Sequence, residues 1–165
     1  MNRCMAGDLI KGKFPETMIV VEEFRGETTI TVDKEHLRKV MAFLKESESL
    51  CYDLLVDLAG IDTGSATHRF TVAYLLHSTK YNNRLRIKVK LEEGASLDTV
   101  SDIWKAANWL ERETYDMFGI LFNNHPDLRR ILLLDDFVGY PLRKDFPLQG
   151  PDFDKPINIC LEEER

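Results

Sequence analysis

The stretch that decides the fold reads Arg84-Leu85-Arg86-Ile87-Lys88-Val89-Lys90-Leu91. Apolar and basic side chains alternate along it, which predicts a β-strand with one face on a hydrophobic core and the other in water. Residues 69–77 repeat the pattern, and Tyr81-Asn82-Asn83 between the two predicts a hairpin turn. The basic face of residues 84–90 is interpreted as a solvated strand surface, with a partner contact as the alternative.

The part of the chain before this hairpin predicts three further strands and a helix. Residues 18–24 and 28–32 are rich in β-branched residues and flank a turn at 25–27. A third strand is expected at 50–59, with Leu54, Val56 and Leu58 on one face. Between the second and third strands, Asp33 is the expected N-cap of a helix, whose apolar stripe is formed by Leu37, Val40, Met41 and Leu44.

After residue 91 the pattern becomes helical and then irregular. A helix is expected from Ser96, with an apolar stripe at Val100, Ile103, Trp104 and Ala107. Asn108 and Glu111 suggest a capping box for a second helix that ends at Gly119. Five prolines interrupt residues 120–165, which predicts an extended C-terminal arm. The predicted architecture is an α+β domain at 1–119, with a mixed, mostly antiparallel sheet of about five strands and helices on one face, followed by the arm at 120–165.

Composition narrows the class of function. The 165 residues include 22 basic and 28 acidic residues, a formal net charge of −6, which argues against a general nucleic-acid binder. No apolar run approaches the roughly 20 residues of a membrane-spanning helix, and residues 1–15 lack a signal-peptide core. We expect a cytosolic protein, or one that meets a membrane only through a partner. Cys4, Cys51 and Cys160 lie far apart, which predicts no metal or iron–sulfur site on this chain.

Residues 111–147 carry most of the information: ERETYDMFGILFNNHPDLRRILLLDDFVGYPLRKDFP. Charges occur there in tight groups beside apolar residues, and ionised groups in such surroundings are paired or desolvated at a cost of several kcal/mol. Arg112 and Asp116 have the i, i+4 spacing of a helical ion pair. Arg129-Arg130 precede Asp135-Asp136, and Arg143-Lys144 precede Asp145. The segment therefore predicts a charge network that closes on its own chain or on a partner.

This segment resembles the signature of the C subunit, or 30-kDa subunit, of proton-translocating NADH:quinone oxidoreductase, respiratory complex I. The likeness rests on Glu111-Arg112-Glu113, Asp116, Met117-Phe118, His125, Arg129, Ile131-Leu132, Asp135-Asp136, Gly139 and Pro141–Pro147. On this basis the interface and structural residues are expected to be Glu111, Arg112, Glu113, Asp116, His125, Pro126, Arg129, Arg130, Asp135, Asp136, Gly139, Arg143, Lys144 and Asp145.

The resemblance implies a subunit that is needed for assembly and has no catalytic residue of its own. It implies that FMN and iron–sulfur clusters belong to partner subunits, in an enzyme that passes electrons from NADH to quinone and translocates protons. The expected neighbours are the large D subunit, which helps to form the quinone site, and the iron–sulfur B and I subunits, on the cytoplasmic face of a bacterial plasma membrane. Residues 148–165 are expected to become ordered only in the complex.

Two other functions stay open at this point. The motif also fits the equivalent subunit of an energy-converting membrane-bound hydrogenase or a related dehydrogenase. A free-standing acid–base enzyme using Glu111, Glu113 and His125 is the other alternative. For the histidine, hydrogen bonding to the backbone or a carboxylate is favoured over proton transfer. For Arg129, Arg130 and Arg143, pairing within the chain or with a protein partner is favoured over binding an anionic headgroup.

Overall fold

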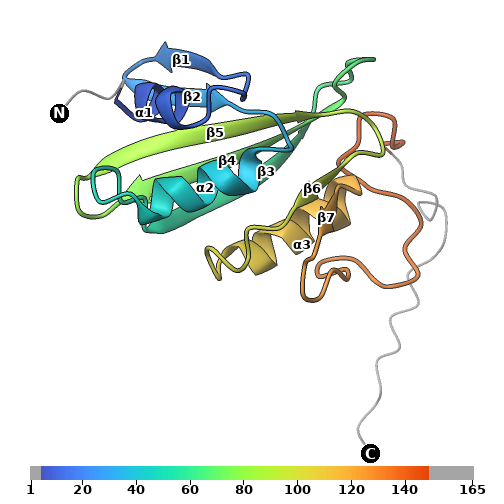
Figure 1. Ribbon diagram of the computed structural model, residues 1–165. Helices are drawn as coiled ribbons and strands as arrows, with labels where there is room; N and C mark the ends of the chain where they lie inside the picture. The colour runs from blue at the N-terminus through green and yellow to red at the C-terminus, as the bar shows by residue number, and fades with distance from the viewer. Residues whose placement is uncertain (1–4, 149–165) are drawn as a thin grey trace, which may run out of the picture.

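The computed structural model describes residues 5–148 and confirms the predicted α+β class (Figure 1). Five strands form one sheet in the order β1-β2-β5-β4-β3, and only the β2–β5 pair is parallel. Its strands are β1 Val20–Phe24, β2 Glu27–Thr31, β3 Leu54–Asp62, β4 Phe70–Ser78 and β5 Asn83–Leu91. The expectation for the tail 148–165 lies, beyond residue 148, outside the described residues.

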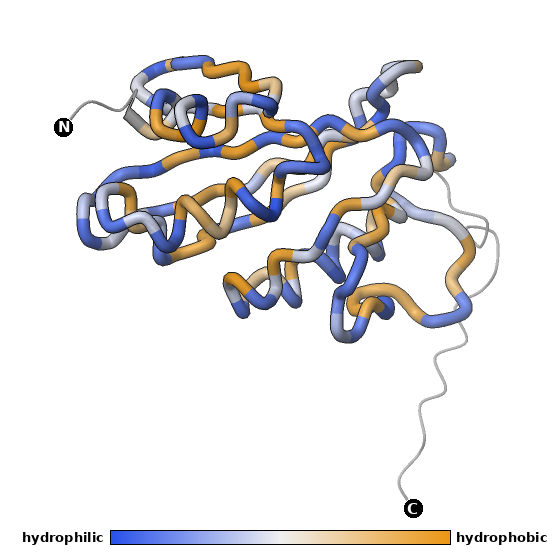
Figure 2. The backbone as a smooth tube through the Cα atoms, in the orientation of Figure 1, coloured by the Kyte–Doolittle hydropathy of each residue, from blue (hydrophilic) through white to orange (hydrophobic). Residues whose placement is uncertain are grey.

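The alternation along these strands sets the two faces of this sheet, and Figure 2 colours β5 by the hydropathy of its alternating residues. The inner face carries Phe70, Val72, Tyr74 and Leu76 from β4 and Leu85, Ile87, Val89 and Leu91 from β5, all buried. Asn82 adopts a φ of 51° in the hairpin turn between these strands, a left-handed conformation that asparagine tolerates. The predicted core strands and their hairpin are therefore confirmed.

The described helices, α1 Met5–Lys13, α2 Leu37–Glu46 and α3 Ala107–Phe118, pack on the inner face. The predicted stripe of α2 is confirmed, because all four of its apolar residues are buried. Gly7 of α1 lies against Val21, which pairs with Ile30 on the inner face, and Phe118 of α3 lies against Gly60 of β3. Asp33 does not cap α2: the helix begins at Leu37, and Asp33 accepts a hydrogen bond from the backbone N–H of Met18.

Two local predictions are wrong, each for a reason that depends on distant residues. A β-bulge between Leu55 and Asp57 turns Val56 outward, so Leu55 and Leu58 are buried while Leu54 and Val56 are exposed. Ser96–Asp98 is not helical. It forms the short strand β6, which pairs in parallel with β7 Leu121–Asn123, and turns rather than a helix carry the chain from residue 99 to α3.

Candidate functional site

Helix α3 carries an unusual number of buried charged groups: Glu111, Arg112 and Asp116 are all buried. The helix ends at Gly119, whose φ of 74° is left-handed, and this confirms the predicted stop. A Cβ at residue 119 would lie 2.5 Å from Tyr140 Cε2 and 2.6 Å from Arg143 Nη2. The C-terminal arm therefore packs directly against the end of α3.

Asp116 is the first anchor of the arm. Its Oδ2 accepts hydrogen bonds from the backbone N–H groups of Ile131, Leu132 and Leu133, at 3.0, 2.8 and 2.9 Å. Its Oδ1 lies 2.6 Å from Arg130 Nη1. Burial opposes ionisation of this carboxyl, but the three N–H groups and Arg130 together outweigh burial and lower the pKa of Asp116. A buried carboxylate thus fixes four consecutive residues of the arm.

Two arginines complete this anchor. Arg130 also donates to the carbonyl oxygens of Phe137 and Gly139, at 3.0 and 3.1 Å, and so closes residues 130–139 into a loop. Arg112 donates to the carbonyl oxygens of Arg129 and Arg130, at 3.2 and 3.1 Å. The predicted ion pair between Arg112 and Asp116 is therefore wrong, since each side chain binds the arm instead of its helical neighbour.

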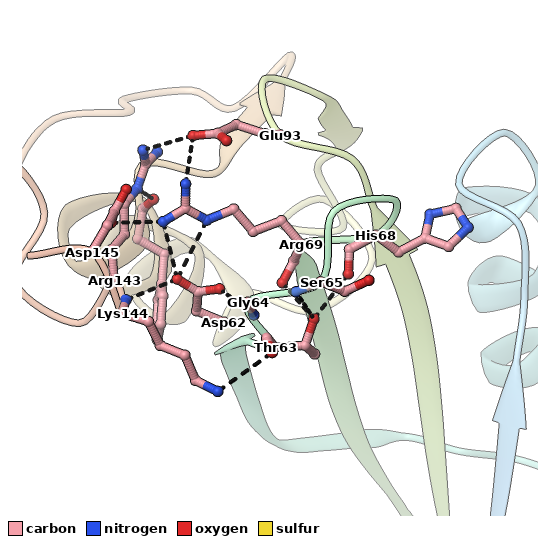
Figure 3. Close-up of polar contacts among 11 residues, drawn as sticks. Asp62, Thr63, Gly64, Ser65, His68, Arg69, Glu93, Arg143, Lys144 and Asp145 are labelled. Atoms are coloured by element: carbon pink, nitrogen blue, oxygen red, sulfur yellow. Dashed lines mark hydrogen bonds and ion pairs between the residues drawn. The ribbon is translucent and has the colours of Figure 1, made fainter.

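Asp62, at the end of β3, is the second anchor (Figure 3). It accepts hydrogen bonds from the backbone N–H groups of Gly64 and Lys144, both at 2.9 Å, and Arg69 Nη2 lies 3.3 Å away. Burial opposes ionisation here too, yet these donors lower the pKa of Asp62. Asp62 and Lys144, which this contact joins, are 82 positions apart in the chain.

Arg69 and Arg143 reinforce the second anchor, and both reach the Glu93 carboxylate (Figure 3). Arg69 lies 2.6 Å from Asp145 and 2.8 Å from Glu93. Both carboxylates raise the pKa of Arg69, and Asp145 has the larger effect. Arg143 donates to the carbonyl oxygen of Phe118 at 2.6 Å, and its guanidinium lies 4.6 Å from the ring centroid of Tyr140. Residues 143–145 are consequently held by both β-sheet and helix.

Glu111 and His125 form a third, fully buried cluster at the start of the arm. Glu111 accepts hydrogen bonds from the Val100 N–H at 2.8 Å and from the Thr99 hydroxyl, and burial raises its pKa to about 7. The predicted capping box is therefore wrong, because Glu111 binds residues 99–100 and Asn108 does not begin the helix.

The contacts of His125 confirm its predicted hydrogen-bonding role. His125 Nδ1 accepts from the Asp127 N–H at 3.0 Å, which leaves Nε2 to donate to the Asn108 carbonyl at 3.1 Å. Nε2 also lies 3.8 Å from the Glu111 carboxylate. This buried histidine therefore links the start of the arm to α3.

Other signature residues do not join these clusters. Glu113, Asp135 and Asp136 are exposed, and none of them has an ion pair among residues 5–148. The Arg129 side chain is 72% exposed and within residues 5–148 forms an ion pair only with Asp127, whereas that of its neighbour Arg130 is 15% exposed. The expected closeness of Arg129-Arg130 to Asp135-Asp136 is thus replaced by the pairing of Arg130 with Asp116.

Sequence reasoning missed Asp62, Arg69, Glu93 and Thr99. Asp62-Thr63-Gly64 does carry a turn signal, since an aspartate often binds the N–H two residues on, as it does here with Gly64. That local pattern cannot identify a partner 82 residues away. The long-range contacts of each anchor therefore could not be predicted from the sequence.

The arm also exposes apolar side chains, and Figure 2 marks a run of hydrophobic positions along the loop after β7. Leu134 and Val138 are each 76% exposed, and the set also includes Leu132, Leu142 and Leu148. Exposed apolar groups held on a fixed backbone are typical of a surface that a protein partner covers.

Comparison with known proteins matches residues 30–152 to the model of a family described as "Respiratory-chain NADH dehydrogenase, 30 Kd subunit". The chain belongs to this family. Proteins named as the C subunit of NADH-quinone oxidoreductase are similar over most of its length. That of Geobacter metallireducens is 53% identical over 144 residues, 86% of this chain and 88% of the relative. That of Paramagnetospirillum magneticum is 43% identical over 145 residues, 87% of this chain and 73% of the relative.

The fold of this chain is also similar to that of one chain in a solved structure described as the membrane-bound sulfane sulfur reductase, an archaeal respiratory membrane complex. The matching chain has a TM-score of 0.73 and 25% identity, over 87% of this chain and 85% of that one. Within residues 5–148, no helix is long and apolar enough to cross a membrane. In the same range, no three His, Cys, Asp or Glu side chains are grouped as metal ligands would be.

Proposed function

We propose that this chain acts as the C subunit of an NADH-quinone oxidoreductase, and that its contribution is a preformed docking surface rather than catalysis. Family membership and the names of its relatives support the enzyme. The observation that supports the docking role is the difference between the polar and the apolar groups of the arm. Asp116 and Asp62 bind polar groups of the arm from within the chain, while apolar side chains such as Leu134, Val138 and Leu142 stay exposed.

The partners and cofactors follow from this proposal. The arm docks on the large D subunit of the quinone site, beside the iron–sulfur B and I subunits, at the cytoplasmic face of a bacterial plasma membrane. FMN and the iron–sulfur clusters belong to those and other subunits, and electrons pass from NADH to quinone with proton translocation. This chain has no part in the electron path. The wide separation of its three cysteines supports that assignment, because a cluster needs several thiolates together.

A second candidate is the equivalent subunit of another respiratory membrane complex, favoured by the similarity to a chain of the sulfane sulfur reductase. The higher identity to the NADH-quinone oxidoreductase subunits outweighs it. The free-standing acid–base enzyme loses its geometric basis. The side chains of Glu111 and His125 are fully buried, whereas Glu113 lies on the exposed side of α3. No substrate could meet all three groups at once.

Affinity purification from the native host tests the proposal. The tag belongs at the N-terminus, so that the arm and tail stay intact. We expect the flavin- and NAD-binding subunits and the large quinone-site subunit to co-purify in fixed ratio. Recovery of the chain alone, or with subunits of a nickel hydrogenase or a sulfur reductase in place of those that bind NAD, would contradict it.

A pair of variants then locates the docking surface. Val138→Asp places a charge on the exposed apolar part of the arm, and we expect a several-fold loss of co-purifying subunits without loss of fold. Gly12→Asp adds the same charge at an exposed position of α1, where a new Cβ lies in open space. The Gly12→Asp chain should bring down its partners normally. Equal recovery of partners with both variants would remove the arm from the docking role.

A further inference from the structure

The outer face of the five-stranded sheet is uncovered in the described part of the chain. All described helices pack on the inner face, and the opposite face has no layer over it (Figure 1). Its residues come from every strand, with Arg84, Arg86, Lys88 and Lys90 of β5 along its middle. The face lies on the side of the sheet opposite α3, to which the arm is anchored, so the docking role proposed for the arm does not account for its basic row.

Three of the four basic side chains on β5 lack an acidic partner within residues 5–148. Arg86 lies 2.8 Å from Glu27, but Arg84, Lys88 and Lys90 form no ion pair there. This chain has six more acidic than basic residues, so unpaired cations in a row are not a consequence of composition. Side chains two apart on a strand are about 6.6 Å from each other, so the row presents regularly spaced positive charges.

The register of the strands shows what surrounds these charges. Lys88 stands opposite Ala73, which stands opposite Ala59, and Lys90 stands opposite Thr71, which stands opposite Ile61. The small side chains of Ala73, Ala59 and Thr71 leave a low floor beside the lysines. The edge strand β3 borders that floor with exposed apolar residues, Ile61 at 43% and Val56 at 54%.

A hollow of about 180 Å³ continues this floor toward the other end of the face, between Val56, Leu75, Arg84 and Arg86. On the far edge, Phe24 of β1 is 71% exposed and lies in register with Glu27 of β2. The face thus combines a positive row, a shallow apolar hollow and apolar edges. Such a mixture of exposed apolar surface and unpaired charge is typical of a protein–protein contact.

We propose that this outer face is a second docking surface, which binds an acidic extended segment of a neighbouring subunit in the same complex. Carboxylates two residues apart on the segment pair with Lys88 and Lys90, and one apolar side chain fills the hollow beside Val56 and Leu75. The neighbouring subunit presupposes the function proposed above; the basic row and the hollow do not depend on it.

The acidic residues around the row favour a protein segment over an anionic membrane surface. Glu22 on β1 and Asp57 on β3 lie at opposite edges of the face, and strand pairing places both in register with Arg86. A flat anionic surface would be repelled at those two points while it is attracted in between. A segment with spaced carboxylates can meet the lysines and avoid both.

Zero-length cross-linking of the purified complex with a carbodiimide tests the proposal, because this reagent joins a lysine amine only to a carboxylate in contact with it. We expect Lys88 or Lys90 to be joined to an Asp or Glu of another subunit, identified by mass spectrometry. We also expect both lysines to react several-fold more slowly with a small amine-reactive compound in the complex than in the purified full-length chain. The proposal is overturned if the lysines react equally fast in the complex and in the isolated chain. It is also overturned if no cross-link forms and the slower reaction in the complex is abolished by removing lipid.

Charge reversal gives an independent readout in the native host. Lys88→Glu combined with Lys90→Glu should lower the amount of assembled complex several-fold, while the circular dichroism and thermal midpoint of the chain stay unchanged. Lys11→Glu combined with Lys39→Glu makes the same change in net charge on exposed positions of α1 and α2. An equal loss with both pairs overturns the proposal. If the unaltered chain recovers no NADH dehydrogenase subunits at all, the function proposed above fails instead.

Discussion

Replacing Arg130 by alanine should release the arm from helix α3, whereas the same change at Arg129 should have almost no effect. The two arginines are neighbours in the sequence, but the side chain of Arg130 is 15% exposed and that of Arg129 is 72% exposed. Arg130 binds the Asp116 carboxylate at 2.6 Å and two carbonyl oxygens of the arm. In the described part of the chain, the Arg129 side chain forms an ion pair only with the half-exposed Asp127.

The expected size of the effect follows from these contacts. Removing one partner of a fully buried ion pair costs about 3–5 kcal/mol, and a hydrogen bond to a charged group contributes about 1.5–3 kcal/mol. Arg130 keeps some contact with water, and the arm can relax into solvent, so we expect about 2–3 kcal/mol for Arg130→Ala. For Arg129→Ala we expect about 0.5 kcal/mol or less, as for other surface substitutions.

Amide hydrogen exchange measures this difference where it arises. The N–H groups of Ile131, Leu132 and Leu133 all donate to Asp116, so they report opening of this part of the arm. In Arg130→Ala their exchange should accelerate about 30- to 150-fold, since 1.36 kcal/mol is a factor of about ten. In Arg129→Ala the change should stay within about twofold. Equal acceleration in both variants, or none in Arg130→Ala, would refute the assignment of Arg130 as the clamp.

Three further changes test the remaining contacts. Glu111→Gln should flatten the pH dependence of stability. Burial raises the pKa of Glu111 from 4.5 to about 7, so this carboxyl adds about 3 kcal/mol of stability below pH 4.5, and the contribution is lost as the pH rises to 7. Urea unfolding across this pH range measures the change. A thermal midpoint lowered by about 5–10 °C is expected for Gly119→Ala, because the new Cβ is strained at φ 74° and meets Tyr140. Asp62→Ala should speed tryptic cleavage after Lys144 about tenfold, because the backbone N–H of Lys144 loses its acceptor. Asp57→Ala, at an exposed position of the same strand, should leave the cleavage rate unchanged.

The parts of the fold that sequence reasoning predicted are those set by short-range periodicity. The two-residue alternation of β4 and β5 and the apolar stripe of α2 need no knowledge of the rest of the chain. The predicted strand of 50–59 shows where this reasoning ends. A single extra residue at Val56 shifts the register, and nothing in the local pattern marks it.

The candidate site was predictable in composition but not in pairing. Its charged residues were recognised, yet spacing suggested that Arg112 pairs with Asp116 on the same helix, and both bind the arm instead. Helical spacing makes a contact possible at no cost in loop closure, but it cannot weigh that contact against several backbone donors from elsewhere. In Asp116 three N–H groups converge on one oxygen, which satisfies a buried carboxylate better than a single arginine could.

These pairings alter how the arm has to be understood. From sequence alone, the charge network of residues 111–147 was expected to close on its own chain or on a partner. Asp116 and Asp62 do hold the arm from within the chain, and the side chains left exposed include the apolar Leu134 and Val138 beside the charged Asp135 and Asp136. An arm already fixed on its own domain loses little conformational entropy when a partner covers it. Mutating its buried charges should therefore weaken assembly indirectly, through loss of this preorganisation, whereas mutating exposed residues such as Leu134 and Val138 should weaken it directly and leave the fold intact.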